Sequence, residues 1–594
     1  MARPVRIANC SGFYGDRLAA AAEMVEGGPI DFLTGDWLAE LTMLILSRTR
    51  AKRPGGGFAR TFVTQMDEVM GRCLDRGIKV VANAGGLDPA GCAEAVREVA
   101  DRLGLGPRIG VVTGDDLMGR LDELAAAGHL LPHLETGEPL GRRRDEAVTA
   151  NAYLGCWGIV EALKAGADIV ITGRVTDAAV VMGPAAYAHG WAPDDWDALA
   201  GACVAGHVIE CGAQATGGNY SFFTEVPDLR HAGFPLAEVA ADGSSVITKH
   251  PGTGGRVDIG TVTSQLLYEI GSARYINPDV VARFDTITLR DDGPDRVAIG
   301  VVRGEPAPET LKVGVNHLGG YRNSFTFCLT GLDIEAKATL LEEQIWSHVP
   351  GGRDAFAFAR TQLVRTDHDD PATNETATAL MRVTVKDPDE RLVGRAFSNV
   401  AIELALASIP GFYGLGGPGT ASPYGVFWPA AVPADLCPQT VTVDGRVTVV
   451  DGRRADTGPP APEVEIAVQQ PDTAAVPAGS TARAPIGRVV GARSGDKGGT
   501  ANLGVFARSA EGYAWLSDFL TVARLRELMP AETAGLEVGR YELPNLRALN
   551  FVIVGLLEEG VAGSSRMDGQ AKSLGEYLRA KLVEVPASLL HGPP

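Results

Sequence analysis

The first 180 residues of this chain of 594 repeat one pattern four times: a strand-like apolar stretch leads into a polar loop, and the loop leads into a helix-like segment. The four copies are VRIANCSGFYGDR, KVVANAGGLDP, RIGVVTGDDL and ADIVITGRVTDAA. Strands that alternate with helices predict a parallel sheet with right-handed crossovers. Sheets of this kind bind ligands at the edge where their loops gather, so these loops are the first candidates for a functional site.

The fold class predicted for the beginning of the chain is an α/β N-terminal domain with a mainly parallel sheet, at about residues 1–200. Apolar residues recur at helical spacing in 36–48 and 90–104. Asp88 followed by Pro89 predicts an N-cap and first helical position for the second of these helices. Loop amides should therefore lie near helix N-termini at the edge of the sheet.

The pattern of predicted elements changes beyond residue 200, where shorter strand candidates lie among helices and glycine-rich turns. An α+β lobe at about 201–450 is expected to complete a core of 1–450. Residues 451–484 are rich in Pro and Ala and predict a solvated linker. The segment 485–594 predicts a compact α+β sandwich. The strands expected in the lobe include GRVDIGTVT, FDTITLR, RVAIGVVR and MRVTVKD.

Composition narrows the classes of partner. The 54 basic and 73 acidic residues give a net charge of −19, which disfavours binding to nucleic acid and to acidic membrane surfaces. No apolar run approaches the ~20 residues of a membrane helix, and the N-terminus lacks the pattern of a secretory signal, so a cytoplasmic location is expected. The eight cysteines form no Cys-x-x-Cys pair, so reduced thiols are expected and no metal site is predicted.

The loop after the first strand contains four candidate ligand-binding residues: Asn9, Gly12, Asp16 and Arg17. Backbone amides in such a loop can bind an anion, with Arg17 as the counter-charge. The segment does not match the Gly-x-Gly-x-x-Gly pattern of dinucleotide-binding loops. A plain structural turn is the alternative interpretation.

Two further loops should reach the same sheet edge. In NAGGLDP, Gly85 and Gly86 permit close approach of a backbone, and Asn83 could contact a ligand or stabilise the turn. In GADIVITGRVTDAA, Arg174 and Asp177 lie three residues apart just past a strand. They could bind a ligand or form a salt bridge with each other. Because the loops gather at one edge, we favour a functional role.

His207, Glu210 and Cys211 lie at helical spacings and could share one helix face. This set could be an acid/base pair beside a thiol, or half of a metal site. The alternative is a capped helix end with a buried histidine. No second histidine or aspartate cluster accompanies the set, so metal binding is not favoured.

Two glycine-rich loops add cations. Lys249, Gly254 and Gly255 belong to TKHPGTGGRV, which could bind a phosphate or carboxylate but does not match a Walker loop. Lys497 lies in RSGDKGGTAN of the C-terminal sandwich. That loop could form a second polar site, dock against the main body, or be held by an internal bridge from Asp496, and we rank docking above catalysis.

Several of these motifs together resemble a known family. SGFYGDR, DWLAELTM, NAGGLDP, ANAYLGCWGIVEALKAGADIVITGRVTDAA, AGHVIECGAQATGGNY, ITKHPGTGGRV and LLYEIGSARYINPDV resemble the acyclic terpene utilisation family. RSGDKGG, LNFVIVGLL and DGQAKSLG resemble its C-terminal ferredoxin-like domain. The resemblance implies a bacterial enzyme that degrades isoprenoid acids, which such pathways carry as coenzyme A thioesters.

The expected function is therefore a hydratase or lyase-type step on a branched acyl-CoA or carboxylic acid. His207 and Glu210 would be the acid and base, with Arg174 and Asp177 in the same catalytic group. Arg174 and Lys249, with the glycine loops, would bind the carboxylate, thioester or phosphates. No cofactor is expected beyond coenzyme A as a substrate carrier, and the partners expected are a small-molecule substrate and further copies of the chain. The rival hypothesis is a non-catalytic ligand-binding or accessory subunit, and a nucleotide-dependent ligase ranks third.

Overall fold

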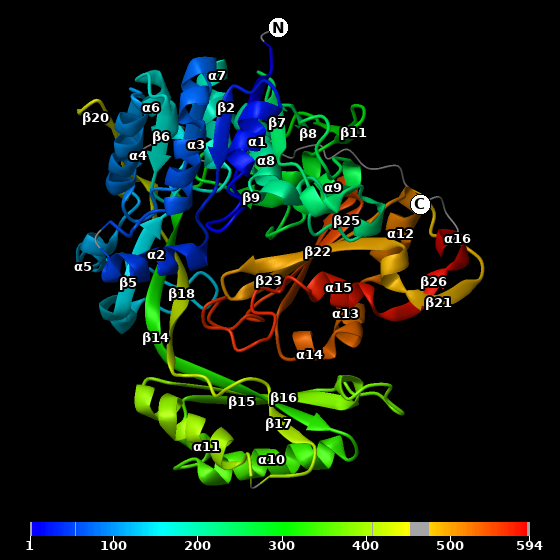
Figure 1. Ribbon diagram of the computed structural model, residues 1–594. Helices are drawn as coiled ribbons and strands as arrows, with labels where there is room; N and C mark the ends of the chain where they lie inside the picture. The colour runs from blue at the N-terminus through cyan, green and yellow to red at the C-terminus, as the bar shows by residue number, and fades with distance from the viewer. Residues whose placement is uncertain (1–2, 54, 407, 452–473, 591–594) are drawn as a thin grey trace. The chain divides into compact units, whose positions relative to one another are not determined.

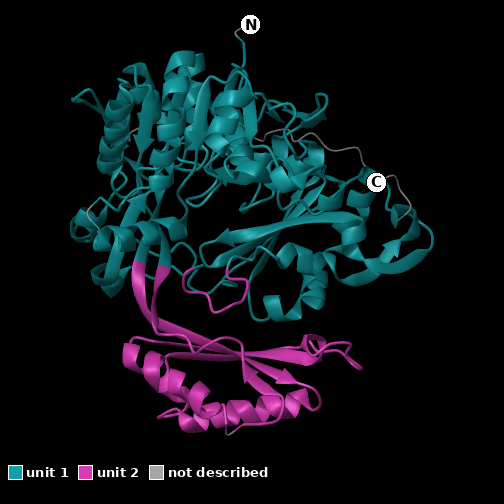
Figure 2. Cartoon of the chain, in the orientation of Figure 1, with its two compact units in different colours: residues 1–316, 427–561, 570–594 teal, residues 317–426, 562–569 magenta. Residues whose placement is uncertain are grey.

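The computed structural model describes residues 3–53, 55–406, 408–451 and 474–590 (Figure 1). Most of the predicted linker, 452–473, lies outside the described residues. The chain divides into two compact units, coloured separately in Figure 2. Unit 1 comprises 1–316, 427–561 and 570–594, and unit 2 comprises 317–426 and 562–569.

Unit 1 is built on an eleven-stranded sheet. Its five central strands are parallel and lie in the order β1 (Val5–Asn9), β2 (Phe32–Gly35), β3 (Lys79–Ala82), β6 (Ile169–Thr172) and β4 (Ile109–Thr113). The four strands predicted from the repeated pattern are all among them. The predicted parallel sheet is thus confirmed for the centre.

The outer parts of this sheet are antiparallel, which the sequence pattern did not indicate. Both outer parts come from beyond residue 200, so strands distant in the sequence extend the sheet begun by the N-terminal repeats. Beside β1 lie β7 (Pro235–Val239), β8 (Ser245–Lys249), β12 (Arg296–Ile299) and β11 (Leu289–Asp291). Beside β4 lie β19 (Gln439–Val443) and β20 (Arg446–Val450).

Helices cover both faces of the parallel centre (Figure 1). One apolar core contains buried residues of α1 (Ala20–Gly27), α3 (Arg60–Arg76) and α4 (Pro89–Leu103). The other contains residues of α5 (Leu121–Ala126), α6 (Trp157–Lys164), α7 (Ala179–His189) and α8 (Trp196–Ile209). The predicted cap of α4 is confirmed, because Asp88 Oδ1 accepts a hydrogen bond from Gly91 N at 2.9 Å and Pro89 is the first helical residue. The predicted helix at 36–48 forms as α2 (Glu40–Lys52).

One predicted strand is wrong. Residues 255–263, GRVDIGTVT, lead into a helix, α9 (Ile259–Leu266). Asp258 begins it with a capping box: its Oδ1 accepts from Thr261 N at 2.8 Å, and its own N–H donates to Thr261 Oγ1 at 3.0 Å. The local cap outweighs the β-branched composition that had favoured a strand.

The C-terminal part of unit 1 carries a separate antiparallel sheet with a helix layer on one face. Its strand order is β22 (Val490–Lys497), β23 (Thr500–Ala507), β25 (Ala548–Ile553) and β24 (Val538–Leu543), and all four strands were predicted. Its core includes residues of α12 (Ala510–Phe519), α13 (Val522–Leu528) and α15 (Leu574–Arg579). Short elements complete it: α14 (Pro530–Thr533), α16 (Ala587–Leu590) and the pair β21 (Thr481–Pro485) and β26 (Leu582–Pro586).

Unit 2 is a sheet packed on helices. Its strands are β15 (Phe358–Val364), β16 (Thr378–Asp387), part of β14 (Thr310–Thr330) and β17 (Phe412–Gly414), and α10 (Ile334–His348) and α11 (Phe397–Glu403) share its apolar core. Two strands pair with β14 outside this order, β5 (Ala147–Ala152) and β18 (Ser422–Pro433). None of the helices in the described ranges combines the length and apolar character needed to cross a bilayer.

Candidate active site

A polar or charged residue ends or closely follows each of the five parallel strands, at the edge where their carboxyl ends meet. These residues are Asn9, Asp36, Asn83, Asp115 and Arg174, and all are buried. The predicted gathering of polar side chains at this edge therefore includes two carboxylates, Asp36 and Asp115, that we had not singled out. Burial raises the pKa of Asp115 to about 6 and that of Asp36 well above its usual value, with nearby Asp177 adding to the shift of Asp36.

The asparagines position the loops. Asn9 Nδ2 donates to the carbonyl oxygen of Glu210 at 3.2 Å, which ties the end of β1 to the end of α8. Asn83 accepts from Trp37 N at 2.7 Å through Oδ1, and its Nδ2 donates to Asp36. Both amides are therefore occupied by protein groups, and they fix the carboxyl edge around Asp36 and Glu210.

Arg174 and Asp177 form the ion pair that their spacing permits. Arg174 Nη1 donates to Asp177 Oδ1 at 2.9 Å and to Leu38 O at 2.8 Å, and its guanidinium lies 4.2 Å from the ring centre of Tyr153. Burial would lower the pKa of Arg174, but the charge of Asp177 and neighbouring groups outweighs it and raises the pKa. Arg174 is buried, whereas 31% of the Asp177 side chain is exposed. The carboxylate is thus held by the arginine while still open to solvent.

His207 and Glu210 lie at the end of α8, with Nδ1 and Oε1 3.3 Å apart. Both side chains are buried. Burial, with the charge of Lys497, lowers the pKa of His207 to about 4, while burial, Asp177 and Glu269 raise the pKa of Glu210 well above its usual value. At neutral pH the imidazole is therefore neutral, and burial favours the protonated form of Glu210. Glu210 Oε2 has no hydrogen-bond partner within the described part of the chain.

Lys497 approaches these residues from the end of β22, just before the turn to β23. Its Nζ donates to Glu269 O at 3.0 Å and lies 5.4 Å from the ring centre of Tyr275, whose ring centre is 4.9 Å from that of His207. The Lys497 residue is exposed to solvent. Its pKa is nevertheless lowered, because the surrounding protein desolvates the ammonium group and the positive charge of Lys312 acts on it. The lysine is therefore open to solvent while lying among buried groups.

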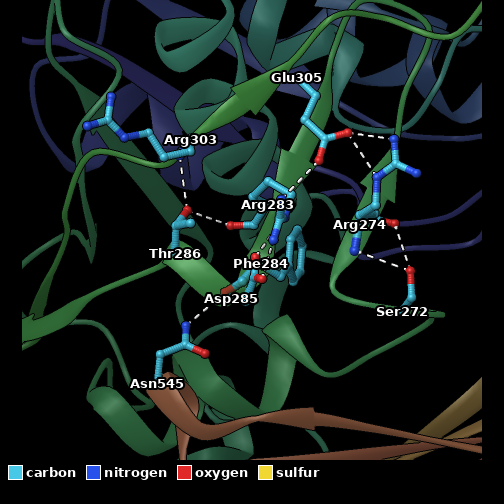
Figure 3. Close-up of polar contacts among 9 residues, drawn as sticks. All are labelled: Ser272, Arg274, Arg283, Phe284, Asp285, Thr286, Arg303, Glu305 and Asn545. Carbon is cyan, nitrogen blue, oxygen red and sulfur yellow. Dashed lines mark hydrogen bonds and ion pairs between the residues drawn. The ribbon is translucent and has the colours of Figure 1, made fainter. Parts of the chain in front are cut away.

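Tyr275 is positioned by a small sheet of β13 (Gly304–Glu305), β10 (Val281–Arg283) and β9 (Arg274–Ile276). Figure 3 shows the charged residues that hold its strands together. Arg283 binds Asp285 at 2.9 Å through Nε and Glu305 at 3.1 Å through Nη1, and Arg274 Nε binds Glu305 at 2.9 Å. These contacts fix β9, and with it the aromatic ring beside His207.

The same small sheet is tied to the C-terminal part of unit 1. Asn545 Nδ2 donates to the carbonyl oxygens of Phe284 at 2.8 Å and Ile287 at 2.9 Å. Phe284 in turn lies 5.6 Å from His207, measured between ring centres.

Lys312 and Glu40 form an ion pair that adjoins both Tyr153 and the turn after Lys497. Lys312 Nζ lies 3.1 Å from Glu40 Oε1 and 4.9 Å from the ring centre of Tyr153, and Gly498 N donates to Glu40 Oε2 at 3.2 Å. Glu40 therefore binds the turn that carries Lys497. The sequence analysis did not single out Lys312, Glu40 or Tyr153. Glu40 and Tyr153 nevertheless lie within two motifs that carry the family resemblance, DWLAELTM and ANAYLGCWGIVEALKAGADIVITGRVTDAA.

The remaining residues of the first loop make contacts within the protein. Gly12 N and Arg17 N donate to the two carboxylate oxygens of Asp16, at 2.8 Å and 2.7 Å. Arg17 also pairs with Glu23 at 2.7 Å. A Cβ on Gly12 would lie 2.7 Å from the backbone of Cys211, so the glycine allows this loop to pack on the end of α8.

The other glycine loops also serve packing. Gly86 has φ +52° and Gly85 lies against Thr172 O, where a Cβ would be 2.5 Å away. Lys249 lies two strands from β1 and binds Asp295 at 3.0 Å and Thr253 O at 2.8 Å. Its neighbours Gly254 and Gly255 pack closely on backbone oxygens, those of Asp228 and Thr216 among them. The structure shows no contact that joins Lys249, Gly254 or Gly255 to the group around Glu210 in the part of the chain that it describes.

These residues therefore combine a buried carboxyl with a raised pKa (Glu210), a carboxylate held by a guanidinium (Asp177 with Arg174) and an accessible cation (Lys497). Such a set can donate a proton, accept one and stabilise developing negative charge on oxygen. His207 lies next to Glu210 and is shielded from solvent.

Comparisons with known proteins agree with this architecture. Residues 5–443 match the family model described as acyclic terpene utilisation family protein AtuA, and residues 484–584 match the model of the AtuA ferredoxin-like domain. No curated protein and no solved structure matches the chain. The first match includes every strand of the parallel centre, and the second includes the sheet that presents Lys497.

Proposed function

The chain belongs to the acyclic terpene utilisation family, and from that premise we propose that it is a catabolic enzyme for branched-chain or isoprenoid acids. The proposed reaction adds water to the substrate or eliminates it, a hydratase or lyase-type step on an acyl-CoA thioester or the free carboxylic acid. The observation that carries this proposal is that the charges of Asp177 and Lys497 both act on Glu210 near the carboxyl edge of the parallel sheet.

In the elimination direction, a base removes the proton next to the substrate carbonyl and an acid protonates the departing hydroxyl group. Asp177 is the proposed base, because it is the exposed carboxylate of the group. Glu210 is the proposed acid, because its raised pKa favours the protonated form. Hydration runs through the same groups in reverse.

Negative charge then develops on the carbonyl oxygen, and a cation is needed beside it. Lys497 is the proposed donor to that oxygen. Arg174 holds Asp177 in place through the 2.9 Å contact and is a positioning residue, as is His207 beside Glu210.

The test is a turnover assay of the full chain with branched acyl-CoA thioesters and the matching free acids, after a thermal-shift screen has identified those that bind. Glu210→Gln and Asp177→Asn should each lower kcat by at least ~100-fold. Glu94→Gln, an exposed acid on α4, is the control and should retain activity. Unchanged turnover in both site variants would remove these roles.

The same assay separates the proposal from the accessory-subunit hypothesis. An accessory subunit would bind an acyl-CoA or acid with an upward shift of melting temperature but would release unchanged ligand. Loss of product formation in Glu210→Gln, with the thermal shift retained, would identify an enzyme.

A further inference from the structure

The sheet of unit 2 has one apolar and one polar face. Alternate residues of its strands, Phe325, Phe327, Met381, Val383 and Val385 among them, belong to the core shared with α10 and α11. The intervening residues point to the opposite face. Strand register pairs Lys386 with Arg322, and Thr384 with Arg360, so these four side chains share the polar face with Arg382.

Arg382 lies among like charges on this face. Burial and the positive charges of Arg322 and Arg360 lower its pKa. Within the described residues, no carboxylate lies within ion-pair distance of Arg382. A concentration of guanidinium groups is unexpected in a chain of net charge −19.

Polar atoms accompany the arginines. Arg360 Nη1 donates to Ser565 Oγ at 3.1 Å, and Arg322 Nη1 lies 3.5 Å from Ser564 O, both in the segment 562–569 of the same unit. Thr384 is 3% exposed, and its Oγ1 has no hydrogen-bond partner in the ranges that the structure describes. Buried hydroxyl groups are normally satisfied, so this one indicates a missing acceptor or donor.

We propose that this polar face binds the phosphate groups of a small phosphorylated ligand. Guanidinium groups match phosphate oxygens in pairs, and a bound dianion would supply acceptors to Arg382 and to the Thr384 hydroxyl. The nucleotide part of a coenzyme A thioester has this chemistry. The inference rests on the proposed function in so far as it assigns this carrier to the substrate.

The experiment is calorimetric titration of the full chain with three probes: coenzyme A, pyrophosphate and pantetheine, which lacks phosphate groups. Coenzyme A should bind at least ~10-fold more tightly than pantetheine, with pyrophosphate competing against it. Arg382→Gln should weaken coenzyme A binding by ~10-fold and leave pantetheine unaffected.

Two further variants make the result specific. Arg360→Gln should repeat the effect of Arg382→Gln, which guards against misfolding of a single variant. Arg353→Gln is the matched control, because Arg353 is an exposed arginine of unit 2 that contacts Glu342 rather than the polar face. Equal affinity for coenzyme A in the wild type and in Arg382→Gln would overturn the inference.

The remaining outcomes separate ligand classes and separate this inference from the proposed function. A single-stranded oligonucleotide that bound more tightly than coenzyme A, in an Arg382-dependent manner, would also overturn the inference. Turnover of free acids with no binding of coenzyme A would refute the phosphate site alone. Arg382-dependent binding of coenzyme A without turnover of any thioester would refute the proposed reaction and leave the phosphate site supported.

Discussion

The Nζ atom of Lys497 donates a hydrogen bond to the backbone carbonyl oxygen of Glu269, 3.0 Å away, and so joins the turn between β22 and β23 to the segment that follows α9. Two asparagines reinforce this junction. Asn502 Oδ1 accepts from Glu269 N at 2.9 Å, and Asn550 Nδ2 donates to Gly271 O at 2.6 Å. The ferredoxin-like domain therefore presents Lys497 to the carboxyl edge of the other sheet through fixed contacts.

Replacing Lys497 should separate catalysis from docking. Lys497→Met removes the cation, and we expect kcat to fall by ~100-fold or more, as for the loss of one oxyanion donor. Lys497→Arg should recover part of the rate because it keeps a charge. The measurement is steady-state kinetics beside thermal melting, with Lys581→Met, a lysine that contacts Tyr577, as control. A fall in melting temperature without a change in kcat would assign Lys497 to docking alone.

His207 should make the protein sensitive to acid. Its pKa in the folded state is about 4, below the ordinary 6.5, so the unfolded chain binds a proton first as pH falls. The contribution of neutral His207 to the free energy of unfolding is therefore complete above pH 6.5. It decreases as the pH falls from 6.5 to about 4, by up to ~3 kcal/mol in total. His207→Asn should therefore flatten the dependence of the urea midpoint on pH in this window.

Exposed His348→Asn is the control for that pH series. Curves that stay parallel for wild type and His207→Asn between pH 4 and 6.5 would show that the imidazole makes no such contribution.

The capping box of α9 should be measurable in stability. Asp258→Ala removes the acceptor for Thr261 N, at an expected loss of ~1 kcal/mol, seen as a lower melting temperature. Asp258→Ser restores the cap but not the 2.6 Å contact with Arg256. Recovery in the serine variant would assign the loss to capping, and no recovery would assign it to the ion pair.

Gly12 should tolerate no side chain. Gly12→Ala places a Cβ 2.7 Å from the backbone of Cys211, so the first loop must move away from the end of α8. We expect a lower melting temperature and reduced turnover, since Glu210 adjoins that contact. Gly106→Ala, where no atom lies within 4 Å of the added Cβ, should behave as wild type. Equal melting temperatures for both variants would contradict the close packing.

Local patterns predicted much of the fold because their causes are local. Alternation of apolar strands with helical periodicity identified β1, β3, β4 and β6, and Asp88 with Pro89 identified the start of α4. The family resemblance is confirmed by matches over 5–443 and 484–584. Residues 255–263 were misread because threonine and valine favour strands, whereas the helix depends on one hydrogen-bonded cap at Asp258.

The antiparallel outer strands could not be predicted from local sequence patterns. Pairing of β7 with β1 joins residues more than 220 positions apart, and no local signal specifies such a partner. The same holds for Lys312 and Glu40, which meet across the fold at 3.1 Å.

The sequence by itself determined the α/β and ferredoxin-like classes, the family and the polar loops at the sheet edge, because these depend on periodicity, caps and motifs within short segments. Only the tertiary structure decided that the charge of Lys497 acts on His207 and Glu210, nearly 300 residues earlier. It also decided the direction of their pKa shifts. Burial and neighbouring charge set those directions, and both arise only when distant segments pack together.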